Sequence, residues 1–579
     1  MIDKTKLAER IRHIEGLTMD EKSSLLALLN EQKRYGLVWE EKEEDVEIQL
    51  QDELPVLKEA LEKQLPIVDG APNHAIIEGD NLHALTCLSY THENSIDVIY
   101  IDPPYNTGNK DFVYNDRYID SEDDYRHSKW LSFMSKRLRL ARRLLSDKGV
   151  IFISIDDNEQ AALKLLCDEI FGERLFVTDL IWRSSDSSNH DSKKFSVDYN
   201  HTLVYVKSED WQPLKVARTE DNNAHYKNPD NDPNGPWFSG NLSSPHPRAN
   251  LMFDIISPQG YTIHPPKNGW RWSKEKMQEF IDSGAIVFPD GGKRLLKKTY
   301  LKDQEGIVPS NIWWDIEVTG HNRNAKYELI KLFPELKTSE IFSTPKPTKF
   351  IKRILEIASY KDSTVLDFFA GSGTTLHAVM QLNKEDGGHR QCILVTNNEN
   401  GICENVTYER NKRVIQGYSN AKGEIVECLP DNNLRYYRTD YVPRERSQRN
   451  MRALVNASTD LLCVQNDLYI ERDFTIDGKK VRKDIARWFG GMLVIYREEF
   501  AEEIANEIAK MDLDGEKLKV YIFSPGRYAF DDVFADVLDK VELVALPAAI
   551  YDAYKRVLPK RKEKTFEEEN KQEIPTTLF

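Results

Sequence analysis

The sequence predicts an α/β fold built around a doubly wound, Rossmann-like sheet. From residue 74 onward, short β-branched segments alternate with amphipathic helical patterns, as at 75–81, 96–101 and 150–155. Near residue 370 a strand pattern passes into a glycine loop and then a helix. The stretch between these regions has a different composition, which predicts an insertion within the sheet.

Length and composition indicate a soluble globular protein of three or four domains. The chain has 579 residues, of which 40% are hydrophobic and 30% charged. No apolar run approaches 18 residues and the N-terminus lacks a signal-peptide pattern, so we expect no membrane association. The six cysteines are scattered without a C-x-x-C pair, which predicts reduced thiols, a cytoplasmic protein and no structural zinc.

The net charge of −16 at first counts against a nucleic-acid partner, because phosphate contacts need Lys and Arg. Much of the acid, however, lies at the two ends, in residues 39–45 and 567–569, and basic clusters occupy residues 136–143 and 293–298. The net charge therefore neither supports nor excludes a nucleic-acid partner. A solvated helix face is the favoured interpretation of the cluster at 136–143, which falls within a helix predicted over 123–146.

Residues 1–70 read as a helical arm for packing or partner binding. Residues 18–21 form a capping-box pattern before a leucine-rich segment. Pro55 suits the first turn of a second helix that continues to about Gln64.

The most informative motif follows a predicted buried strand, Ile96–Ile101. The next residues are Asp102, Pro103, Pro104 and Tyr105. A strand cannot continue through two prolines, so these four residues should form a stiff loop at the carboxyl end of a strand, where open α/β sheets bind ligands. A simple strand-terminating turn is the alternative.

This loop has the chemistry to hold a nucleobase amino group. Ionised Asp102 and the Pro103 carbonyl are both acceptors and can take the two amino hydrogens. Tyr105 would then stack on the base, which must be flipped out of a duplex to reach the loop. The loop itself supplies no electrophile.

A second loop lies within residues 363–375, where a strand pattern passes into a glycine loop, and it reads Phe369, Ala370, Gly371, Ser372, Gly373, Thr374. Two glycines two residues apart let the backbone approach a ligand closely. A dinucleotide fingerprint fails because Leu376 holds the third glycine position, and a P-loop fails because no Gly-Lys-Ser/Thr follows.

The inserted region, residues 209–344, is rich in Asn, Asp, Pro, Gly and Trp and shows weak periodicity. Its aromatic residues, among them Trp237, Trp270 and Trp272, lie among Arg, Lys and Asn. They suit either base and phosphate contacts or the core of a small domain, and the sequence leaves both readings open.

Together the two loops resemble those of the S-adenosylmethionine-dependent amino-group methyltransferases of DNA. An acceptor loop that precedes the donor loop by about 265 residues, with an insertion between them, is similar to the permuted β class. The longer strings at 101–108, 149–159 and 394–400 resemble modification (Mod) subunits of type III restriction–modification systems. The resemblance implies a permuted Rossmann-like methyltransferase sheet and adenine N6 as acceptor, since relatives acting on cytosine N4 more often carry Ser or Thr in place of Asp102.

The resemblance also implies the residues of the site. Asp102, Pro103, Pro104 and Tyr105 would be catalytic and no metal is implied. Where many relatives place the acid that binds the ribose hydroxyls this chain has Thr396 and two asparagines, so that role passes to Glu399. The residues implied to bind S-adenosylmethionine are Asp80, Lys346, Asp367, Phe369, Ala370, Gly371, Gly373, Thr374 and Glu399.

The expected organisation has five parts. They are an N-terminal helical arm (1–70), a first methyltransferase part with the acceptor loop (71–208), a target-recognition domain (209–344), a second methyltransferase part with the cofactor loop (345–419) and a small C-terminal α/β domain (420–579). Strands are predicted in the last part at 492–496, 518–523 and 541–546, and helices at 498–511 and 530–540.

The resemblance implies duplex DNA, a second copy of the chain and a separate helicase–nuclease restriction subunit as partners, with subunit contacts made by residues 420–579. Three alternatives remain open. They are a stand-alone adenine methylase, a non-catalytic recognition subunit and, least favoured because of Leu376, a dehydrogenase.

Overall fold

The computed structural model describes residue 39 and residues 42–559, apart from residues 115, 116, 121, 122, 124, 338–341, 421, 427 and 514. The capping pattern at residues 18–21 lies outside this part of the chain. In the described part, no helix is both long and apolar enough to cross a bilayer.

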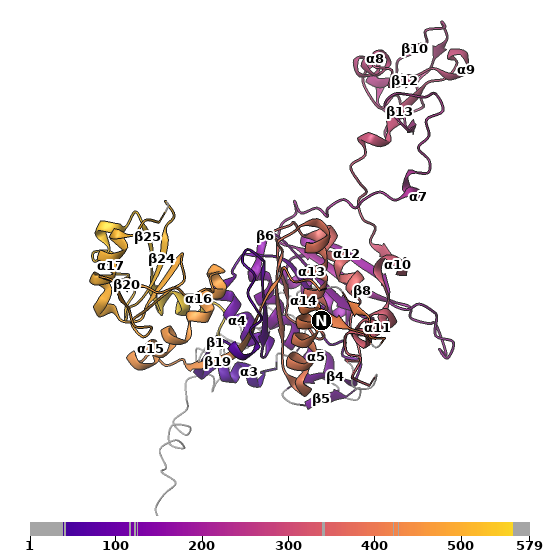
Figure 1. Ribbon diagram of the computed structural model, residues 1–579. Coiled ribbons are helices and arrows are strands. Elements are labelled where there is room, and N and C mark those ends of the chain that lie inside the picture. Colours follow the sequence, from indigo (N-terminus) through magenta and orange to yellow (C-terminus); the bar gives the residue numbers. More distant parts are fainter. Residues whose placement is uncertain are drawn as a thin grey trace, which may run out of the picture.

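A ten-stranded sheet forms the centre of the molecule, in the order β1-β19-β2-β16-β15-β3-β6-β8-β7-β14 (Figure 1). The run from β19 to β6 is entirely parallel, whereas β1 and β8 pair antiparallel with their neighbours. The α/β prediction is confirmed. The strands are β1 (Glu53–Glu59), β2 (Asn73–Glu78), β3 (Ile96–Ile101), β6 (Leu145–Ile155), β7 (Phe176–Arg183), β8 (Tyr199–Val206), β14 (Ile312–Trp313), β15 (Thr364–Asp367), β16 (Gln391–Thr396) and β19 (Asn433–Pro443).

Helices cover both faces of this sheet because side chains alternate along each strand. Ile99 and Ile151 lie in one core, whereas Val98 and Val150 lie in the other. The first core packs against α3 (Asp45–Asp52), α4 (Asn81–Thr91), α5 (Arg126–Leu144), α6 (Gln160–Ile170), α15 (Gln448–Ala457), α16 (Thr459–Asn466) and α18 (Ala548–Tyr554). The second packs against α11 (Asn322–Leu332), α12 (Thr348–Ala358), α13 (Thr374–Asp386) and α14 (Glu409–Gln416).

Two findings concern the ends of the sheet. The helix predicted from Pro55 to Gln64 was wrong, because Pro55 lies in β1, which pairs with β19 at the sheet edge. A proline lacks a ladder donor and is tolerated on an edge strand, so its presence did not require a helix. The sheet also continues past residue 419, since β19 lies between β1 and β2.

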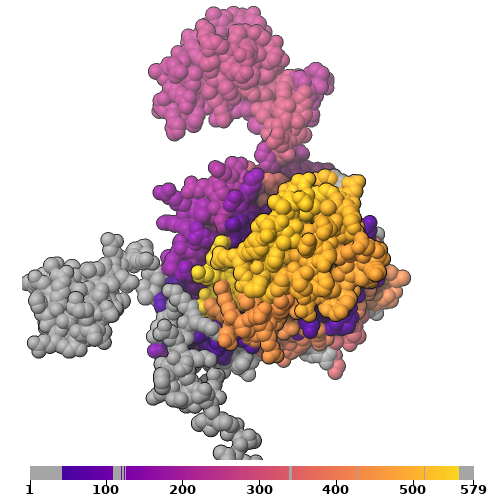
Figure 2. All heavy atoms as spheres, turned by 90° about the vertical axis from the view of Figure 1, so that its left-hand side faces the viewer, coloured from indigo at the N-terminus to yellow at the C-terminus, as the bar shows by residue number. Residues whose placement is uncertain are grey.

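The inserted region contains a small lobe that projects from the sheet on a narrow stalk (Figures 1 and 2). Trp270 is buried in its core and donates from Nε1 to the Phe253 carbonyl at 2.7 Å, so for this residue the structure favours the core reading. The lobe is built from β9 (Trp237–Gly240), β10 (Ile255–Ile256), β11 (Thr262–Ile263), α8 (Lys274–Asp282), β12 (Ile286–Val287) and β13 (Leu296–Tyr300).

A four-stranded sheet forms most of the C-terminal part, in the order β22-β23-β24-β25. Its strands are β22 (Ala486–Trp488), β23 (Met492–Ile495), β24 (Leu518–Phe523) and β25 (Val541–Leu546), with α17 (Ala501–Lys510) on one face. The helix predicted over 530–540 was wrong. Phe530 has a left-handed backbone (φ 64°) and only one 3-10 turn, Ala535–Val537, follows it.

Candidate active site

The two loops recognised in the sequence lie side by side because β15 pairs with β3. Val365 is in register with Val98, and Leu366 with Ile99. Asp367 and Asp102 therefore stand at the carboxyl ends of adjacent parallel strands. The fold brings together two motifs that are about 265 residues apart in the sequence.

Asp102 lies in a closed set of polar contacts with Tyr105 and Lys346. The Tyr105 hydroxyl donates to Asp102 Oδ1 at 2.9 Å, and Lys346 Nζ donates to Asp102 Oδ2 at 2.5 Å. Lys346 Nζ also donates to the Tyr105 hydroxyl at 2.9 Å, and Asn200 Nδ2 donates to it at 3.2 Å. Both carboxylate oxygens of Asp102 are thus engaged, and burial together with nearby Asp102 raises the pKa of Tyr105 well above its usual value. Sequence reasoning missed Asn200 and the contact between Lys346 and Asp102.

The acceptor loop is anchored on both sides of this set. Trp130 Nε1, in α5, donates to the Pro104 carbonyl at 2.7 Å. Asn106, which follows Tyr105, is buried with a left-handed backbone (φ 55°) and donates from Nδ2 to Glu159 Oε1 at 2.6 Å. Asparagine tolerates this conformation better than most residues, which explains how the chain turns away directly after the loop.

The glycine loop turns tightly under Asp367. This buried carboxylate accepts from the Phe369 amide at 3.0 Å and from the Thr375 hydroxyl at 2.5 Å. Burial raises the pKa of Asp367 to about 7. Gly373 needs its missing side chain, because its φ is +74° and a Cβ there would lie 2.5 Å from Asn411 Nδ2.

Buried contacts tie the glycine loop to the lysine segment. Thr374 Oγ1 donates to the Lys346 carbonyl at 3.2 Å. Arg410, a fully buried side chain of α14, donates from Nη1 to Thr374 Oγ1 at 2.8 Å and to Ser372 Oγ at 3.2 Å. No sequence motif pointed to Arg410, since it lies in an amphipathic helix beyond the recognised strings.

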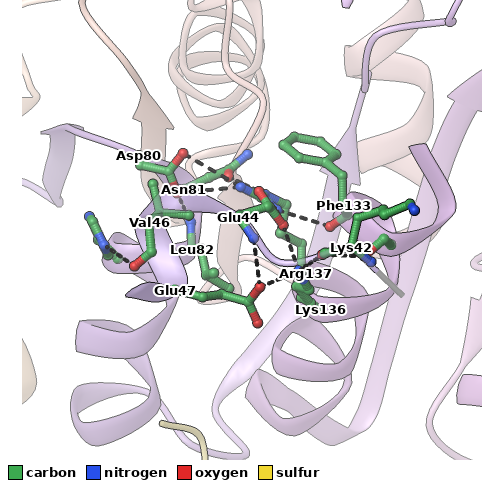
Figure 3. Close-up of polar contacts among 12 residues, drawn as sticks. Lys42, Glu44, Val46, Glu47, Asp80, Asn81, Leu82, Phe133, Lys136 and Arg137 are labelled. Atoms are coloured by element: carbon green, nitrogen blue, oxygen red, sulfur yellow. Dashed lines mark hydrogen bonds and ion pairs between the residues drawn. The ribbon is translucent and has the colours of Figure 1, made fainter. Parts of the chain in front are cut away.

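Asp80 and Asn81 lie on the other side of the glycine loop, at the end of β2 (Figure 3). Asp80 caps α4 by accepting from the Leu82 amide at 2.7 Å, and Asn81 Nδ2 donates to the Phe368 carbonyl at 3.2 Å. Arg137, in α5, hydrogen-bonds Asn81 Oδ1 and lies 3.4 Å from Asp80 Oδ1.

Arg137 is fully buried, which the favoured reading of its basic cluster as a solvated face did not anticipate. Its guanidinium stacks 3.5 Å from the Phe133 ring centroid and donates to Glu44 at 3.0 Å. Phe133 in turn contacts Phe369, with ring centroids 5.9 Å apart. Arg137 therefore braces both the end of β2 and the glycine loop.

Glu399 lies exposed in the turn Glu399–Gly401 that follows β16. Since β16 lies between β2 and β15, the carboxyl edge of the sheet carries a row of acids, each following a neighbouring strand. Along the edge these are Asp80, Glu399, Asp367 and Asp102. In the described residues, no group of three or more His, Cys, Asp or Glu side chains has the arrangement of a metal site.

This donor set suits S-adenosylmethionine. Carboxylates accept from ribose hydroxyls and attract a sulfonium cation. The N-terminus of α13, which begins directly after Gly373, presents amides to a carboxylate. Asp80 and Glu399 would serve the nucleoside end, and the loop from Phe369 to Thr374 the methionine end.

A family model described as DNA methylase, N6_N4_Mtase, matches residues 96–418, more than half of the chain. The chain belongs to this family. The match includes both loops, the inserted region and Arg410 of α14, and leaves the end of β2 and the C-terminal sheet outside.

Named relatives of the DNA methylase family include two Mod subunits. The chain is 38% identical over 354 residues to the type III restriction-modification enzyme StyLTI Mod subunit of Salmonella typhimurium, an alignment covering 56% of this chain and 52% of that protein. It is 33% identical over 382 residues to the EcoPI Mod subunit of Escherichia phage P1, covering 56% and 57%. The chain thus spans about half the length of these relatives. It is also 32% identical to the type II methyltransferase M.KpnI of Klebsiella pneumoniae, over 61% of this chain and 87% of that protein.

Proposed function

We propose that this chain moves a methyl group from S-adenosylmethionine to adenine N6 in duplex DNA. We further propose that it does so as the modification and specificity subunit of a type III restriction–modification system. The observation that carries the proposal is the pairing of β3 with β15, which places Asp102 beside the glycine loop. Family membership and the names of the two Mod relatives support it.

Asp102 and the Pro103 carbonyl hold the amino group of the flipped adenine by accepting its two hydrogens. In the structure the Asp102 oxygens accept from Tyr105 and Lys346, and the amino group of the base would take the place of the Tyr105 hydroxyl. The displaced Tyr105 is then free to stack on the base. When bound, S-adenosylmethionine supplies the electrophilic methyl group.

Positioning supplies most of the acceleration in this scheme, because the residues hold the acceptor nitrogen and polarise it without forming a covalent bond to it. Trp130 and Asn106 hold the acceptor loop rigid for this purpose. The region 209–344 would select the sequence around the target adenine, and residues 420–579 would contact other subunits.

A tritiated-methyl assay on unmethylated duplex DNA tests the reaction, and sequencing that detects modified adenines identifies both the base and the recognition sequence. We expect incorporation of label and N6-methyladenine at one motif. Absence of label from any DNA would contradict the proposal, and label on cytosine would reject the assignment of adenine.

A stand-alone methylase is the second candidate, because the type II enzyme M.KpnI aligns over most of its length. Co-purification from the native host separates the two. A helicase–nuclease chain bound in stoichiometric amount supports the type III assignment, and an active enzyme without such a chain supports the stand-alone form. Sedimentation of the purified chain tests the proposed homodimer.

A further inference from the structure

A long loop, residues 184–198, rises from the same sheet edge as the acceptor loop. It joins β7 to β8, and Arg183 at its start is in register with Tyr199 at its end. Next along the sheet, His201 pairs with Ile155 of β6, and Ile153 of β6 pairs with Ile101 of β3. The end of the loop at Tyr199 therefore stands two strands from Asp102, and its start at Arg183 stands three strands away.

The strand that follows the loop reaches the set formed by Asp102, Tyr105 and Lys346, because Asn200 Nδ2 of β8 donates to the Tyr105 hydroxyl at 3.2 Å. Phe195 precedes Asn200 by five residues. Five residues of fully extended chain span at most about 18 Å, so Phe195 lies within that distance of a residue that contacts Tyr105.

The tip of the loop has an unusual surface. Phe195 is 93% exposed, the highest value among the exposed large hydrophobic side chains in the described part of the chain. Lys193 and Lys194, immediately before it, are also exposed. An aromatic ring beside two cations combines a stacking surface with phosphate-binding charge.

Hydrogen bonds brace the base of this loop. The Ser184 amide donates to the Asp198 carbonyl at 3.0 Å, and the Asn189 amide donates to Ser196 Oγ at 2.7 Å. Arg323 Nη1 pairs with Asp186 at 2.7 Å and ties the loop to α11. A braced loop loses less entropy when it presents Phe195 to a partner.

We propose that Phe195 enters the base stack of duplex DNA at the place vacated by the flipped base, while Lys193 and Lys194 contact the flanking phosphates. The inference rests on the proposed function, since extrusion of a base leaves a gap that an apolar side chain can fill. Proteins that unstack a duplex use inserted Phe and other apolar side chains in this way. Filling the gap offsets part of the cost of unstacking and keeps the base in the acceptor loop.

The test uses the full chain and duplexes carrying its recognition sequence, found by the methylation assay or by selecting bound duplexes from a random pool. One duplex is fully paired, and in the other the target adenine faces an abasic site. Phe195→Ala should slow methyl transfer by about 5- to 160-fold on the paired duplex, because stacking on an aromatic ring is worth about 1–3 kcal/mol. On the abasic duplex the loss should fall to less than about threefold, because little unpairing is then needed.

Two further variants provide matched controls. Phe195→Trp should retain activity on both duplexes, and Val197→Ala, at an apolar residue of the same loop that is 61% exposed, should change activity less than twofold or so. Replacement of Lys193 and Lys194 by Gln should make the logarithm of the DNA-binding constant fall less steeply with the logarithm of salt concentration. The change in slope should match the loss of about two phosphate contacts. Equal losses for Phe195→Ala on both duplexes, or none, would overturn the proposal.

A binding readout separates this inference from the proposed function. A 2-aminopurine placed at the target position brightens when it leaves the stack, whether or not methyl transfer follows. Brightening with the wild-type chain but not with Phe195→Ala supports insertion of Phe195 into the base stack. Brightening without any methyl transfer would reject only the proposed reaction. Unchanged brightening and transfer in Phe195→Ala, together with loss of self-association in sedimentation, would assign Phe195 to a contact between copies of the chain instead.

Discussion

The two sheets of this protein use the ends of their parallel strands in opposite ways. At the carboxyl edge of the ten-stranded sheet, polar side chains from separate segments face one another, as Asp102, Tyr105 and Lys346 do. At the carboxyl ends of the four-stranded sheet, Arg452 of α15 donates to the Tyr496 carbonyl at 3.4 Å and lies 4.2 Å from the Phe523 ring centroid. A strand end covered by a helix is used for packing, and only the uncovered edge is available for chemistry.

We therefore predict that changes at the first edge affect transfer or cofactor binding, whereas changes to buried residues of the C-terminal part affect stability and leave transfer unchanged. The largest effect should come from Asp102→Ala, which removes the acceptor that orients the amino group. We expect methyl transfer to fall by about 10³-fold or more, with the Kd for S-adenosylmethionine nearly unchanged. Single-turnover transfer and equilibrium dialysis measure the two quantities, and retained transfer would reject the site.

Lys346→Met should lower the rate of transfer by about 10- to 100-fold, because a charge-assisted partner that positions both Asp102 and Tyr105 is lost. Lys349→Met is the matched control, since Lys349 is exposed and, among the residues that the structure describes, donates only to the Glu317 carbonyl. If the two variants have the same rate constant, Lys346 does not position the acceptor loop.

Asp367→Asn should change how stability depends on pH. The folded-state pKa of Asp367 is about 7 against an ordinary value of 3.8, so the folded chain binds the extra proton between these values and loses stability as pH rises through the window. At about 1.4 kcal/mol per pH unit the loss amounts to at most about 4 kcal/mol. Urea unfolding at pH 5 and pH 8 should show the part of this loss between pH 5 and pH 7, about 3 kcal/mol, in the wild type and not in Asp367→Asn. Parallel curves would contradict the prediction.

Arg137→Met should weaken S-adenosylmethionine binding by about tenfold while changing the maximal rate much less, because Arg137 braces Asp80 and the glycine loop without reaching Asp102. A titration of the KM for S-adenosylmethionine measures the effect. Arg139→Met serves as the control on the same helix, because Arg139 is 53% exposed and pairs only with Glu169 in the described structure. A fall in maximal rate at unchanged KM would contradict a role of Arg137 in supporting the cofactor site.

The smallest effect should come from Tyr554→Phe in α18. The buried Tyr554 hydroxyl donates to the Pro55 carbonyl at 2.8 Å, so its removal should cost about 1 kcal/mol of stability and leave transfer unchanged. Thermal unfolding and the tritiated-methyl assay on the same preparation check both parts. A loss of transfer would show that the C-terminal part is coupled to the active site.

The strands and loops of the candidate site could be predicted because their signals are local. The strand before Asp102 ends at two prolines, and the glycine loop follows directly on a strand, so each is legible within about ten residues. The order of the strands could be predicted only from the resemblance to known methyltransferases. No local sequence pattern near Val98 or Val365 indicates that these two residues pair in the sheet.

The missed features depend on tertiary context. In the sequence, Arg137 cannot be told from the other cations of its helix. Its burial depends on α3 and the end of β2, which cover it in the fold. Pro55 reads as a helix start, and only the position of β1 at the sheet edge explains why a strand accepts it. The sequence predicts Lys346 as a cofactor residue. It does not show the contact between Lys346 and Asp102, because that contact depends on how α12 packs beside β3.

The strand order also governs how this protein can be made. Of the first three described strands to leave the ribosome, no two are neighbours, because β19 lies between β1 and β2, and β16 and β15 lie between β2 and β3. At about 5–20 residues per second, roughly 15 to 60 s separate synthesis of Ile101 from that of Thr396, and the β2 edge that pairs with β16 stays open throughout this interval. Open edges invite pairing with other chains. Production of this chain should therefore depend on chaperones, or on slow synthesis at low temperature, more than its ordinary composition suggests.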